Sequence, residues 1–497
     1  MSSTVLPIAL RAGARQALVV GGGNVALRKA RVLVASGFRI RVVAPRVDEG
    51  LRELAGVSLL ERPYEERDVR DVALAVAATG DEGVDARVVI DARAHGVLVC
   101  DATMPERGDF TMLATLRLGD LTIAVESGGS SPSFSRRILD EIDARFGSAY
   151  ADATRTLARI RKEIRTTLPR DDRIALMRRL SALPVEELAA MHEHPRLVCA
   201  SRASALATVQ ARSVAALVAL RTIATEILDV TTAGDRDRRR ALHDLGDANV
   251  FVKELETALR DGRADYAVHS CKDLPSELPA DMAIAAISAR EDPRDAFCSE
   301  RYAGFDALPA GAVVGTSSLR RRFQLEAMRP DLRYENLRGN VDTRLRKLRE
   351  GQYDAIVLAM AGLARLGVRA THTVPWDVDV LVPAAGQGAL AVEIRRSSEL
   401  LAYELRAAVN DAEAERCVLC ERAALRALRA GCSAPVGVHA RARGDVVLAE
   451  LVYSTPVGVL RERGERRAQT PAEAEELGRM LAESIAQRLT LPAGARS

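Results

Sequence analysis

Short apolar runs alternate with helical patterns over the N-terminal quarter of the chain. Residues 17–20 form an apolar run, Gly21–Gly23 follow it, and the next stretch has the hydrophobic period of a helix that Gly37 ends. Residues 39–43 are a second strand-like run. Further strands are predicted at 73–78, 97–100 and 121–125. This β-α-β opening is typical of a doubly wound sheet.

A helical region follows. Ser131-Pro132 indicates a helix start, because proline suits the first turn, and an apolar residue recurs at every fourth position from Phe134 to Phe146. Residues 149–190 are charged, nearly free of glycine and helical in period, which predicts a small helical subdomain. The stretch 192–195 breaks this pattern, and we place the main boundary there.

Strands and helices alternate again in the rest of the chain. Strand candidates, each followed by a helix-like stretch, lie at 197–200, 265–269, 312–314 and 354–359. The last part is predicted as a helix around Arg422 to Leu428, strands at 436–441 and 446–453, and a final helix at 471–488. The pattern therefore predicts a multidomain α/β protein.

The bulk composition fits a soluble intracellular protein. A chain of 497 residues is too long for one core, and 48% hydrophobic with 28% charged residues is ordinary for globular proteins. No apolar stretch is long enough to span a bilayer, and we read no secretory signal at the start. Seven irregularly spaced cysteines suggest reduced thiols in a cytoplasm, with the Cys417-x-x-Cys420 pair structural. A net charge of +3 gives no support to a nucleic-acid function.

The glycine turn near the N-terminus is a candidate dinucleotide site. Gly21-Gly22-Gly23-Asn24-Val25-Ala26 fits G-x-G-x-x-A between a strand and a helix. Glycines there allow a tight turn and let backbone amides approach a pyrophosphate at the positive end of the helix. The acidic residue usually expected to hold the ribose is missing, because the second strand ends in Val43-Ala44-Pro45-Arg46.

A wider set of motifs in the same region resembles one enzyme family. The motifs are the glycine turn with Arg28-Lys29, Ala78-Thr79-Gly80-Asp81, Asp101, Phe110 and Ser127-Gly128-Gly129-Ser130-Ser131-Pro132. Together they resemble the precorrin-2 dehydrogenase family, the dehydrogenase module of sirohaem synthases, over about residues 5–190. The resemblance implies NAD-dependent oxidation of precorrin-2 to sirohydrochlorin, and this family also lacks the acidic ribose residue.

Site residues follow from that resemblance. Asp101 matches the family's functional aspartate, and Asn24, Val25, Pro45 and Arg46 match its NAD-contacting positions, with Gly21 and Gly23 in the turn. An aspartate after a strand could accept the proton lost as hydride leaves, and the alternative is a turn or cap residue. Leu98 stands where the family usually has asparagine. Some members also insert ferrous iron, and the sequence leaves that activity open.

The C-terminal part carries a dense series of motifs. In order they are Ala200-Ser201-Arg202-x-Ser204, Thr232-x-Gly234-Asp235, Phe251-Val252-Lys253-Glu254, Val268-His269-Ser270-Cys271-Lys272-Asp273-Leu274-Pro275, Arg290-Glu291-Asp292-Pro293-Arg294-Asp295, Gly315-Thr316-Ser317-Ser318-Leu319-Arg320-Arg321, Asn336-Leu337-Arg338-Gly339-Asn340, Thr343-Arg344, Gly386-Gln387-Gly388-Ala389 and Gly431-Cys432-x-x-Pro435. This series resembles hydroxymethylbilane synthase (porphobilinogen deaminase) over about residues 196–497.

The cationic residues of these motifs suit the substrate of that family. Porphobilinogen carries acetate and propionate groups, and planar guanidiniums bind carboxylates in forked geometry. We predict carboxylate-binding roles for the motif residues at strand-to-helix turns, since α/β domains bind ligands at the carboxyl ends of strands. These residues are Arg202, Ser204, Lys253, Lys272, Ser318, Arg320, Arg321, Arg338 and Arg344. Any one of these arginines alone could be a solvated surface residue.

The resemblance assigns the chemistry to two residues. Asp273 is the catalytic carboxylate that stabilises the substrate cation and shuttles protons, and Cys432 carries the covalent dipyrromethane primer. Spacing alone would not have singled out Cys432. The loop Gly246-Asp247-Ala248-Asn249-Val250 departs from the family, because Ala248 replaces its usual lysine, which weakens the expected retention of substrate.

The sequence therefore predicts a fusion of two enzymes of tetrapyrrole synthesis. The expected parts are a Rossmann-like NAD-binding domain, a dimerisation and helical subdomain, two α/β domains of periplasmic-binding-protein type and a small α+β domain with the cofactor cysteine. Their expected bounds are 1–112, 113–194, 196–290 with about 386–410, 291–385 and 411–497. We expect porphobilinogen and precorrin-2 as ligands, no nucleic acid or membrane partner, and a homodimer through 110–147.

Three alternatives stay open. The C-terminal half could be a non-catalytic carboxylate-binding protein of the periplasmic type. The N-terminal half could keep its fold only as a scaffold for dimerisation. It could also be a general NAD dehydrogenase of small substrates.

Overall fold

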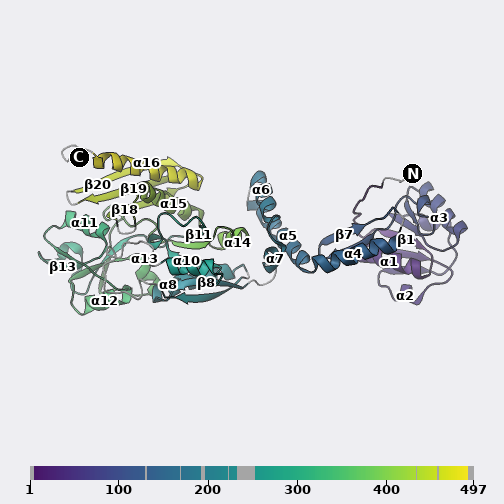
Figure 1. The fold of residues 1–497 in the computed structure, drawn as a ribbon, viewed down its shortest axis with the longest axis horizontal. Coiled ribbons are helices and arrows are strands. Elements are labelled where there is room, and N and C mark those ends of the chain that lie inside the picture. Colours follow the sequence, from purple (N-terminus) through teal and green to yellow (C-terminus); the bar gives the residue numbers. More distant parts are fainter. Residues whose placement is uncertain are drawn as a thin grey trace. The chain divides into compact units, whose positions relative to one another are not determined.

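The chain folds into two compact units, Met1–Glu163 and Ile164–Ser497. The computed structural model, drawn in Figure 1, describes residues 5–128, 131–167, 169–191, 196–221, 223–231, 252–431, 434–455 and 458–490. The boundary predicted at 192–195 lies outside these residues, and the predicted division into five parts stays a prediction. Among the described segments, no helix is both long and apolar enough to cross a membrane.

The first unit is built on a parallel sheet with helices on both faces. Its elements are β1 (Gln16–Val20), α1 (Asn24–Ala35), β2 (Arg39–Val43), α2 (Glu49–Arg52), β3 (Val57–Leu60), β4 (Leu74–Ala77), α3 (Glu82–Ala94) and β5 (Leu98–Asp101). The strand order is β3-β2-β1-β4-β5, with every pair parallel. Alternate residues of β1 point to opposite faces, so that Val19 packs with α1 and Leu18 with α3. The topological switch next to β1 places the Gly21–Gly23 turn where such sheets bind ligands.

A hairpin and a run of helices follow along the chain and continue into the second unit. They are β6 (Ala114–Leu118), β7 (Leu121–Val125), α4 (Pro132–Phe146), α5 (Ala149–Thr167), α6 (Arg170–Leu180) and α7 (Val185–Ala190). Helix α4 begins after Ser131, whose hydroxyl caps the Phe134 N–H, and it ends at Gly147 in a positive-φ conformation. It packs against β6 and β7. The boundary between the two units falls inside α5.

After α6 and α7, the second unit forms a mixed sheet. Its elements are β8 (Arg196–Arg202), α8 (Ala205–Ala219), β9 (Ala224–Val230), α10 (Lys253–Arg260), β10 (Tyr266–Ser270), β11 (Met282–Ile287), β17 (Leu390–Arg395) and α14 (Glu399–Val409). The strand order is β11-β17-β10-β8-β9, and β17 runs antiparallel to both of its neighbours. The chain therefore leaves this domain after β11 and returns to it as β17.

The excursion between β11 and β17 forms a second mixed sheet. Its elements are β12 (Asp295–Ser299), β13 (Val313–Gly315), α11 (Leu319–Met328), β14 (Arg333–Glu335), α12 (Val341–Arg349), β15 (Ala355–Ala359), α13 (Met360–Leu366) and β16 (His372–Pro375). The strand order is β14-β13-β15-β12-β16, with β12 antiparallel to its neighbours. The two crossover segments, 288–294 and 376–389, run side by side, because Glu291 N–H donates to Gly388 O over 3.2 Å.

The C-terminal part is a three-stranded antiparallel sheet covered by two helices. Its elements are α15 (Ala412–Ala427), β18 (Val436–Arg443), β19 (Val446–Thr455), β20 (Gly458–Arg467) and α16 (Pro471–Thr490), all visible in Figure 1. Val438, Leu451 and Leu460 from the strands share a core with Leu477 and Ile485 of α16.

The predicted α/β fold class is confirmed, with a parallel doubly wound sheet, two mixed α/β sheets and a small α+β domain. Three details of the sequence prediction were wrong. No helix follows β10, because a short 3₁₀ turn, Cys271–Asp273, leads on to β11. The helix expected around 422–428 begins a full ten residues earlier, as α15. Several strands with weak patterns were missed, among them β3, β12, β17 and β20.

Candidate active sites

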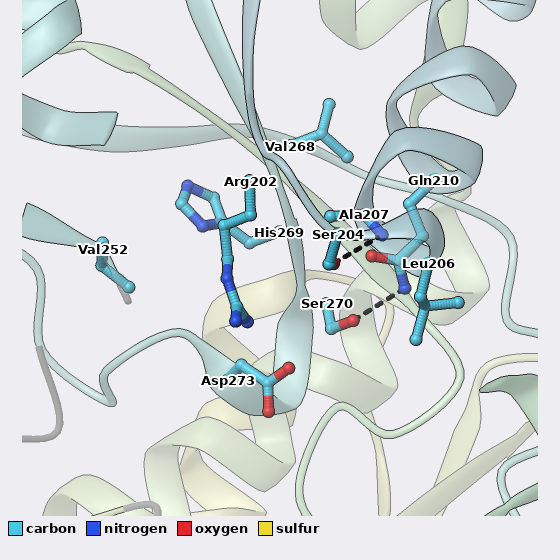
Figure 2. Close-up of a pocket in the computed structure, with 10 residues that line it drawn as sticks. All are labelled: Arg202, Ser204, Leu206, Ala207, Gln210, Val252, Val268, His269, Ser270 and Asp273. Atoms are coloured by element: carbon cyan, nitrogen blue, oxygen red, sulfur yellow. Dashed lines mark hydrogen bonds between the residues drawn. The ribbon is translucent and has the colours of Figure 1, made fainter. Parts of the chain in front are cut away.

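A pocket opens at the carboxyl ends of β8 and β10 in the second unit, as α/β folds predict. It is lined by Arg202, Ser204, Leu206, Ala207, Gln210, Val252, Val268, His269, Ser270 and Asp273. Figure 2 shows the Arg202 side chain extending toward the Asp273 carboxylate. Ser204 is the N-cap of α8, where its hydroxyl accepts a hydrogen bond from Ala207 N–H over 3.3 Å. The pocket therefore pairs a cation and a helix N-terminus with one carboxylate.

Asp273 is exposed at the end of the 3₁₀ turn, and its neighbour Lys272 is half-buried. The Lys272 ammonium donates to Gln387 Oε1 over 3.2 Å. Desolvation lowers the pKa of Lys272 to about 8, although the nearby Asp273 charge opposes the shift. The turn thus presents an ammonium and a carboxylate side by side.

Arg320 and Arg321, in the first turn of α11, are held by a single buried carboxylate. Arg320 Nη2 lies 2.8 Å from Asp295 Oδ2, and Arg321 Nη2 lies 2.6 Å from Asp295 Oδ1. Burial alone would raise the pKa of Asp295, but the two guanidiniums outweigh it and hold that pKa far below its ordinary value. Both arginines also donate to backbone, to Val382 O from Arg320 and to Val357 O from Arg321.

Guanidinium N–H groups around these residues are left without partners. Arg321 Nε and Arg338 Nη2 are buried and have no hydrogen-bond partner among the described residues. Desolvation lowers the pKa of Arg344 to about 10, with Arg321 and Arg338 adding repulsion and Asp273 opposing it. Buried donors without acceptors are rare in folded proteins, so this cluster is suited to an anionic ligand.

The first unit presents its glycine turn at the start of α1. Gly23 is the N-cap of α1 and offers no side-chain cap. A Cβ on Gly22 would lie 1.8 Å from Arg46 O, and one on Gly21 2.2 Å from Ala78 O. Asn24 and Val25 are exposed beside the turn. Uncapped helix N–H groups behind a glycine turn form a site for a phosphate group.

Asp101 ends β5 and is 1% exposed. Its Oδ1 accepts hydrogen bonds from Thr103 N–H (2.9 Å) and Met104 N–H (2.8 Å), and its Oδ2 lies 3.0 Å from Arg107 Nε. In this structure the carboxylate therefore caps the following loop, which is the second of the two roles that its sequence context allowed. Its catalytic role stays a prediction.

Family models match most of the chain. Residues 197–402 match the dipyrromethane cofactor-binding domain of porphobilinogen deaminase, and residues 415–487 match its C-terminal domain. The porphobilinogen deaminase of Rubrobacter xylanophilus is 48% identical over 293 residues, which cover 59% of this chain and 94% of that protein. The porphobilinogen deaminase of Burkholderia thailandensis is 50% identical over 295 residues, covering 58% of this chain and 89% of that protein. This chain belongs to the porphobilinogen deaminase family.

The region before the deaminase unit has matches of its own. Residues 8–114 match a family described as putative NAD(P)-binding. The solved structure of SirC, precorrin-2 dehydrogenase, is 25% identical, covering 35% of this chain and 89% of that protein, with a TM-score of 0.31. Another solved structure with a match to this chain is the periplasmic VFT2 domain of Bordetella pertussis BvgS, which is 19% identical, covering 44% of this chain and 90% of that protein, with a TM-score of 0.29.

The residues predicted for the deaminase site fall into three groups. The first group lies either in the pocket or among the neighbouring cations, and Asp273 interacts with both sets. This group contains Arg202, Ser204, Lys272, Asp273, Ser318, Arg320, Arg321, Arg338 and Arg344. Lys253 is exposed at the start of α10. Cys432 and the loop 246–250 lie outside the described residues.

Sequence reasoning missed two buried residues of the deaminase site, Asp295 and Gln387. Both stand in the quoted motifs, but neither was given a role. An aspartate that opens an apolar strand, followed by Ala296 and Phe297, is a signal that could have marked Asp295. A buried carboxylate needs a cationic partner, and the paired arginines of α11 were the available ones.

The Cys417-x-x-Cys420 pair lies inside α15. Both thiols are buried, and burial raises the pKa of Cys417 to about 12. A thiol of this kind is inert, which is in keeping with the structural role expected for the pair. In the part of the chain that the structure describes, no three His, Cys, Asp or Glu side chains are grouped to hold a metal ion.

Proposed function

We propose that the unit Ile164–Ser497 is a hydroxymethylbilane synthase, which joins four porphobilinogen molecules and releases ammonia at each step. One observation carries the proposal. Arg321 Nε and Arg338 Nη2 are buried and have no hydrogen-bond partner among the described residues. These two arginines and Arg344 form a cation cluster, and the exposed Asp273 carboxylate is close enough to oppose the lowering of the pKa of Arg344 by desolvation. An enzyme that adds acidic pyrroles one at a time needs such an anion cradle next to a single acid–base group.

The same donors fit a dipyrromethane primer attached to Cys432. Lys272, Arg321 and Arg338 would hold its carboxylates, because each offers an N–H group in a partly desolvated place. When bound, the primer supplies the pyrrole carbon to which the first porphobilinogen is joined.

The residues of this chain have separate roles in the reaction. The arginines hold the acetate and propionate groups of the incoming substrate. Asp273 stabilises the positive charge that is left on the substrate as the C–N bond breaks and ammonia departs. After the new C–C bond forms, the same carboxylate accepts the proton that leaves the attacking pyrrole carbon and passes it on.

The mass of the intact protein tests this proposal. The purified chain should be heavier than its sequence by one dipyrromethane, and Cys432→Ser should remove the increment. Cys417→Ala is the matched control, since it removes a buried thiol of α15 and should keep the increment. Incubation with porphobilinogen should then release hydroxymethylbilane. A protein without bound pyrrole that also ignores the monomer after reconstitution would favour the alternative, a carboxylate-binding protein.

We further propose that the unit Met1–Glu163 oxidises precorrin-2 to sirohydrochlorin with NAD. The uncapped start of α1 behind Gly21–Gly23 suits the NAD pyrophosphate, and Pro45 and Arg46 follow β2 close to this turn. Bound NAD would accept the hydride. Asp101 Oδ1 holds the Thr103 and Met104 N–H groups, so Oδ2, which pairs with Arg107, is the oxygen that would take the accompanying proton.

Formation of NADH from precorrin-2 tests the dehydrogenase. Turnover that depends on precorrin-2 and is lost in Asp101→Asn supports the proposal. NAD binding without turnover would favour the scaffold, and turnover of small substrates that Asp101→Ala leaves unchanged would favour a general dehydrogenase. Adding ferrous iron together with sirohydrochlorin, and measuring sirohaem, decides whether iron is also inserted.

A homodimer through residues 110–147 belongs to the same proposal. In α4, Ser135 and Leu139 are buried, whereas Phe134 is 54% exposed and Ile138 only half-buried. An exposed aromatic ring on a helix face that repeats apolar residues suits contact with a second copy. Phe134→Lys should therefore yield monomers in analytical ultracentrifugation, while Glu141→Lys, a change of an exposed charged residue on the same helix, should leave the dimer intact.

A further inference from the structure

Gln387 lies on the second crossover segment and is 1% exposed. Its Nε2 donates to Asp295 Oδ1 over 2.8 Å and to Pro293 O over 2.7 Å, and its Oε1 accepts from Lys272 Nζ over 3.2 Å. The amide orientation is fixed by chemistry, because an ammonium needs an acceptor and a carboxylate needs a donor. The Gln387 side chain therefore connects the Lys272 ammonium, which follows β10, to the buried Asp295 carboxylate, which begins β12.

Asp295, which Gln387 contacts, also forms ion pairs with Arg320 and Arg321. Lys272 follows β10, a strand of the sheet β11-β17-β10-β8-β9. Both arginines belong to α11, which follows β13 of the sheet β14-β13-β15-β12-β16. The path Lys272–Gln387–Asp295 thus links cations that stand beside two different sheets.

The backbone on both sides holds Gln387 in place. Gly388 has φ +93°, and a Cβ there would lie 2.4 Å from Glu291 O. Gly386 has φ +72°, and a Cβ there would lie 2.7 Å from Cys271 Sγ, next to Lys272. Only glycine allows so close an approach with these dihedral angles, so the backbone around Gln387 packs tightly against Glu291 of the other crossover and against Cys271.

We infer that Gln387 is a positioning residue of the synthase reaction, which fixes the Lys272 ammonium relative to Arg320 and Arg321 so that cations from two domains meet the substrate carboxylates in one arrangement. It acts through Lys272 and does not touch the substrate. The inference rests on the proposed synthase function.

A neutral amide is the group that this place requires. The charged groups that face Lys272 are Asp273 from its own turn, Asp295 from β12, and Arg320 and Arg321 from α11. A glutamate at position 387 would pair with the ammonium, compete with the substrate carboxylates and raise the pKa of Lys272. A methionine would keep the volume but leave both Lys272 and Asp295 without that contact.

A matched control is available in Gln324. This glutamine is 4% exposed, accepts from Val382 N–H over 2.9 Å and donates to Arg320 O over 3.1 Å. It is as buried as Gln387 and lies in the same region, but its hydrogen bonds are to backbone and not to Lys272 or Asp295. The loss of a buried amide alone should therefore affect Gln324→Met and Gln387→Met equally.

The test compares Gln387→Met, Gln387→Glu and Gln324→Met in the full chain, with the primer content checked by mass. Steady-state kinetics with porphobilinogen over a pH series, together with thermal unfolding, are the measurements. Gln387→Met should raise KM about tenfold, as expected for a lost contact to a charged group, with a smaller change in kcat. Gln324→Met should lower Tm to a similar extent but keep KM within about twofold. Gln387→Glu should move the alkaline limb of kcat/KM upward by about one pH unit.

Two results would overturn the inference. One is an equal effect of Gln387→Met and Gln324→Met on KM, which would reduce Gln387 to a structural amide. The other is an alkaline limb that Gln387→Glu leaves unmoved. Failure of the synthase proposal itself looks different, because the unmodified chain would then turn over no porphobilinogen at any pH.

Discussion

Asp295 and Arg321 form a buried ion pair in which Oδ1 and Nη2 are 2.6 Å apart. Arg320 completes the group on the other carboxylate oxygen. From the sequence, both arginines were expected to bind carboxylates of the substrate or cofactor. The structure shows that part of their charge is used to neutralise a carboxylate that is fully buried at the start of β12. The carboxylate fixes both guanidiniums in place, and the remaining N–H of Arg321 stays available for an anion.

Asp295→Asn should destabilise the second unit by about 3–5 kcal/mol, because two buried guanidiniums would lose their counterion. Chemical denaturation followed by circular dichroism measures the change. Asp331→Asn is the control, since Asp331 makes a 2.7 Å pair with Arg329 at the surface and should cost far less stability than Asp295→Asn. Equal costs for the two variants would contradict the structural role given to Asp295.

Asp273→Asn should lower kcat by about 10²–10⁴-fold, the range for loss of a group that provides acid–base and electrostatic catalysis. The carboxylate is exposed, so Tm should hardly change. The rate of porphobilinogen consumption is the measurement. Glu277→Gln, which removes another exposed carboxylate four positions further on, should keep full activity. Loss of activity in both variants would point to an electrostatic effect of the surface as a whole.

Acid should weaken the junction between the crossovers and the C-terminal domain. Glu421 of α15 pairs with Arg290 at 2.8 Å, and its carboxylate also accepts from Gly386 and Ala440 N–H groups. Burial opposes ionisation, but Arg290 and His439 outweigh it and lower the pKa of Glu421 to about 2. A carboxyl with a depressed folded-state pKa contributes stability above its unfolded pKa of 4.5, and that stability disappears as pH falls toward 2.

The expected contribution of Glu421 at neutral pH is about 3 kcal/mol, from the size of the shift. The measurement is the free energy of unfolding between neutral pH and pH 3. Glu421→Gln should lose stability at neutral pH and show a flatter acid dependence. Glu326→Gln, which removes a partner of an exposed pair with Arg322, should follow the unmodified chain throughout. An acid dependence that Glu421→Gln leaves unaltered would show that other groups govern it.

Gly23→Asp separates folding from NAD binding in the first unit. Gly23 has extended backbone dihedral angles at the N-cap of α1, and a Cβ there would meet no atom within 4 Å. Aspartate is a favoured N-cap, so Tm should stay the same or rise slightly. Its charge would stand where the pyrophosphate is expected, so NAD affinity should fall about tenfold or more. Gly23→Ser, a neutral cap, should bind NAD better than Gly23→Asp in calorimetry; equal affinities would place the dinucleotide elsewhere.

Local features of the molecule could be predicted from the sequence because they depend on neighbouring residues. The start of α4 at Ser131-Pro132, the N-cap of α11 at Ser318 and the position of Asp273 after β10 all follow from a few adjacent side chains. The motifs also gave the family, which the matches with the deaminase models then showed. The assignments of Cys432 and of the individual carboxylate-binding residues stay predictions.

The partners of these residues could not be predicted, since they come from distant parts of the chain. Lys272 and Gln387 are separated by 115 positions, and Arg321 lies 26 positions after Asp295. Likewise, the sequence left Asp101 either a catalytic or a cap residue, and only the path of the following loop brings Thr103 and Met104 onto its carboxylate.

The sequence by itself determined many of the elements, where several of them begin, and which charged side chains stand at their ends. The tertiary structure decided which of those charges neutralise each other and which stay available for a ligand. The physical reason is that a charge must find a partner once it is buried, and the choice of partner depends on which strands pair and where the chain crosses between domains.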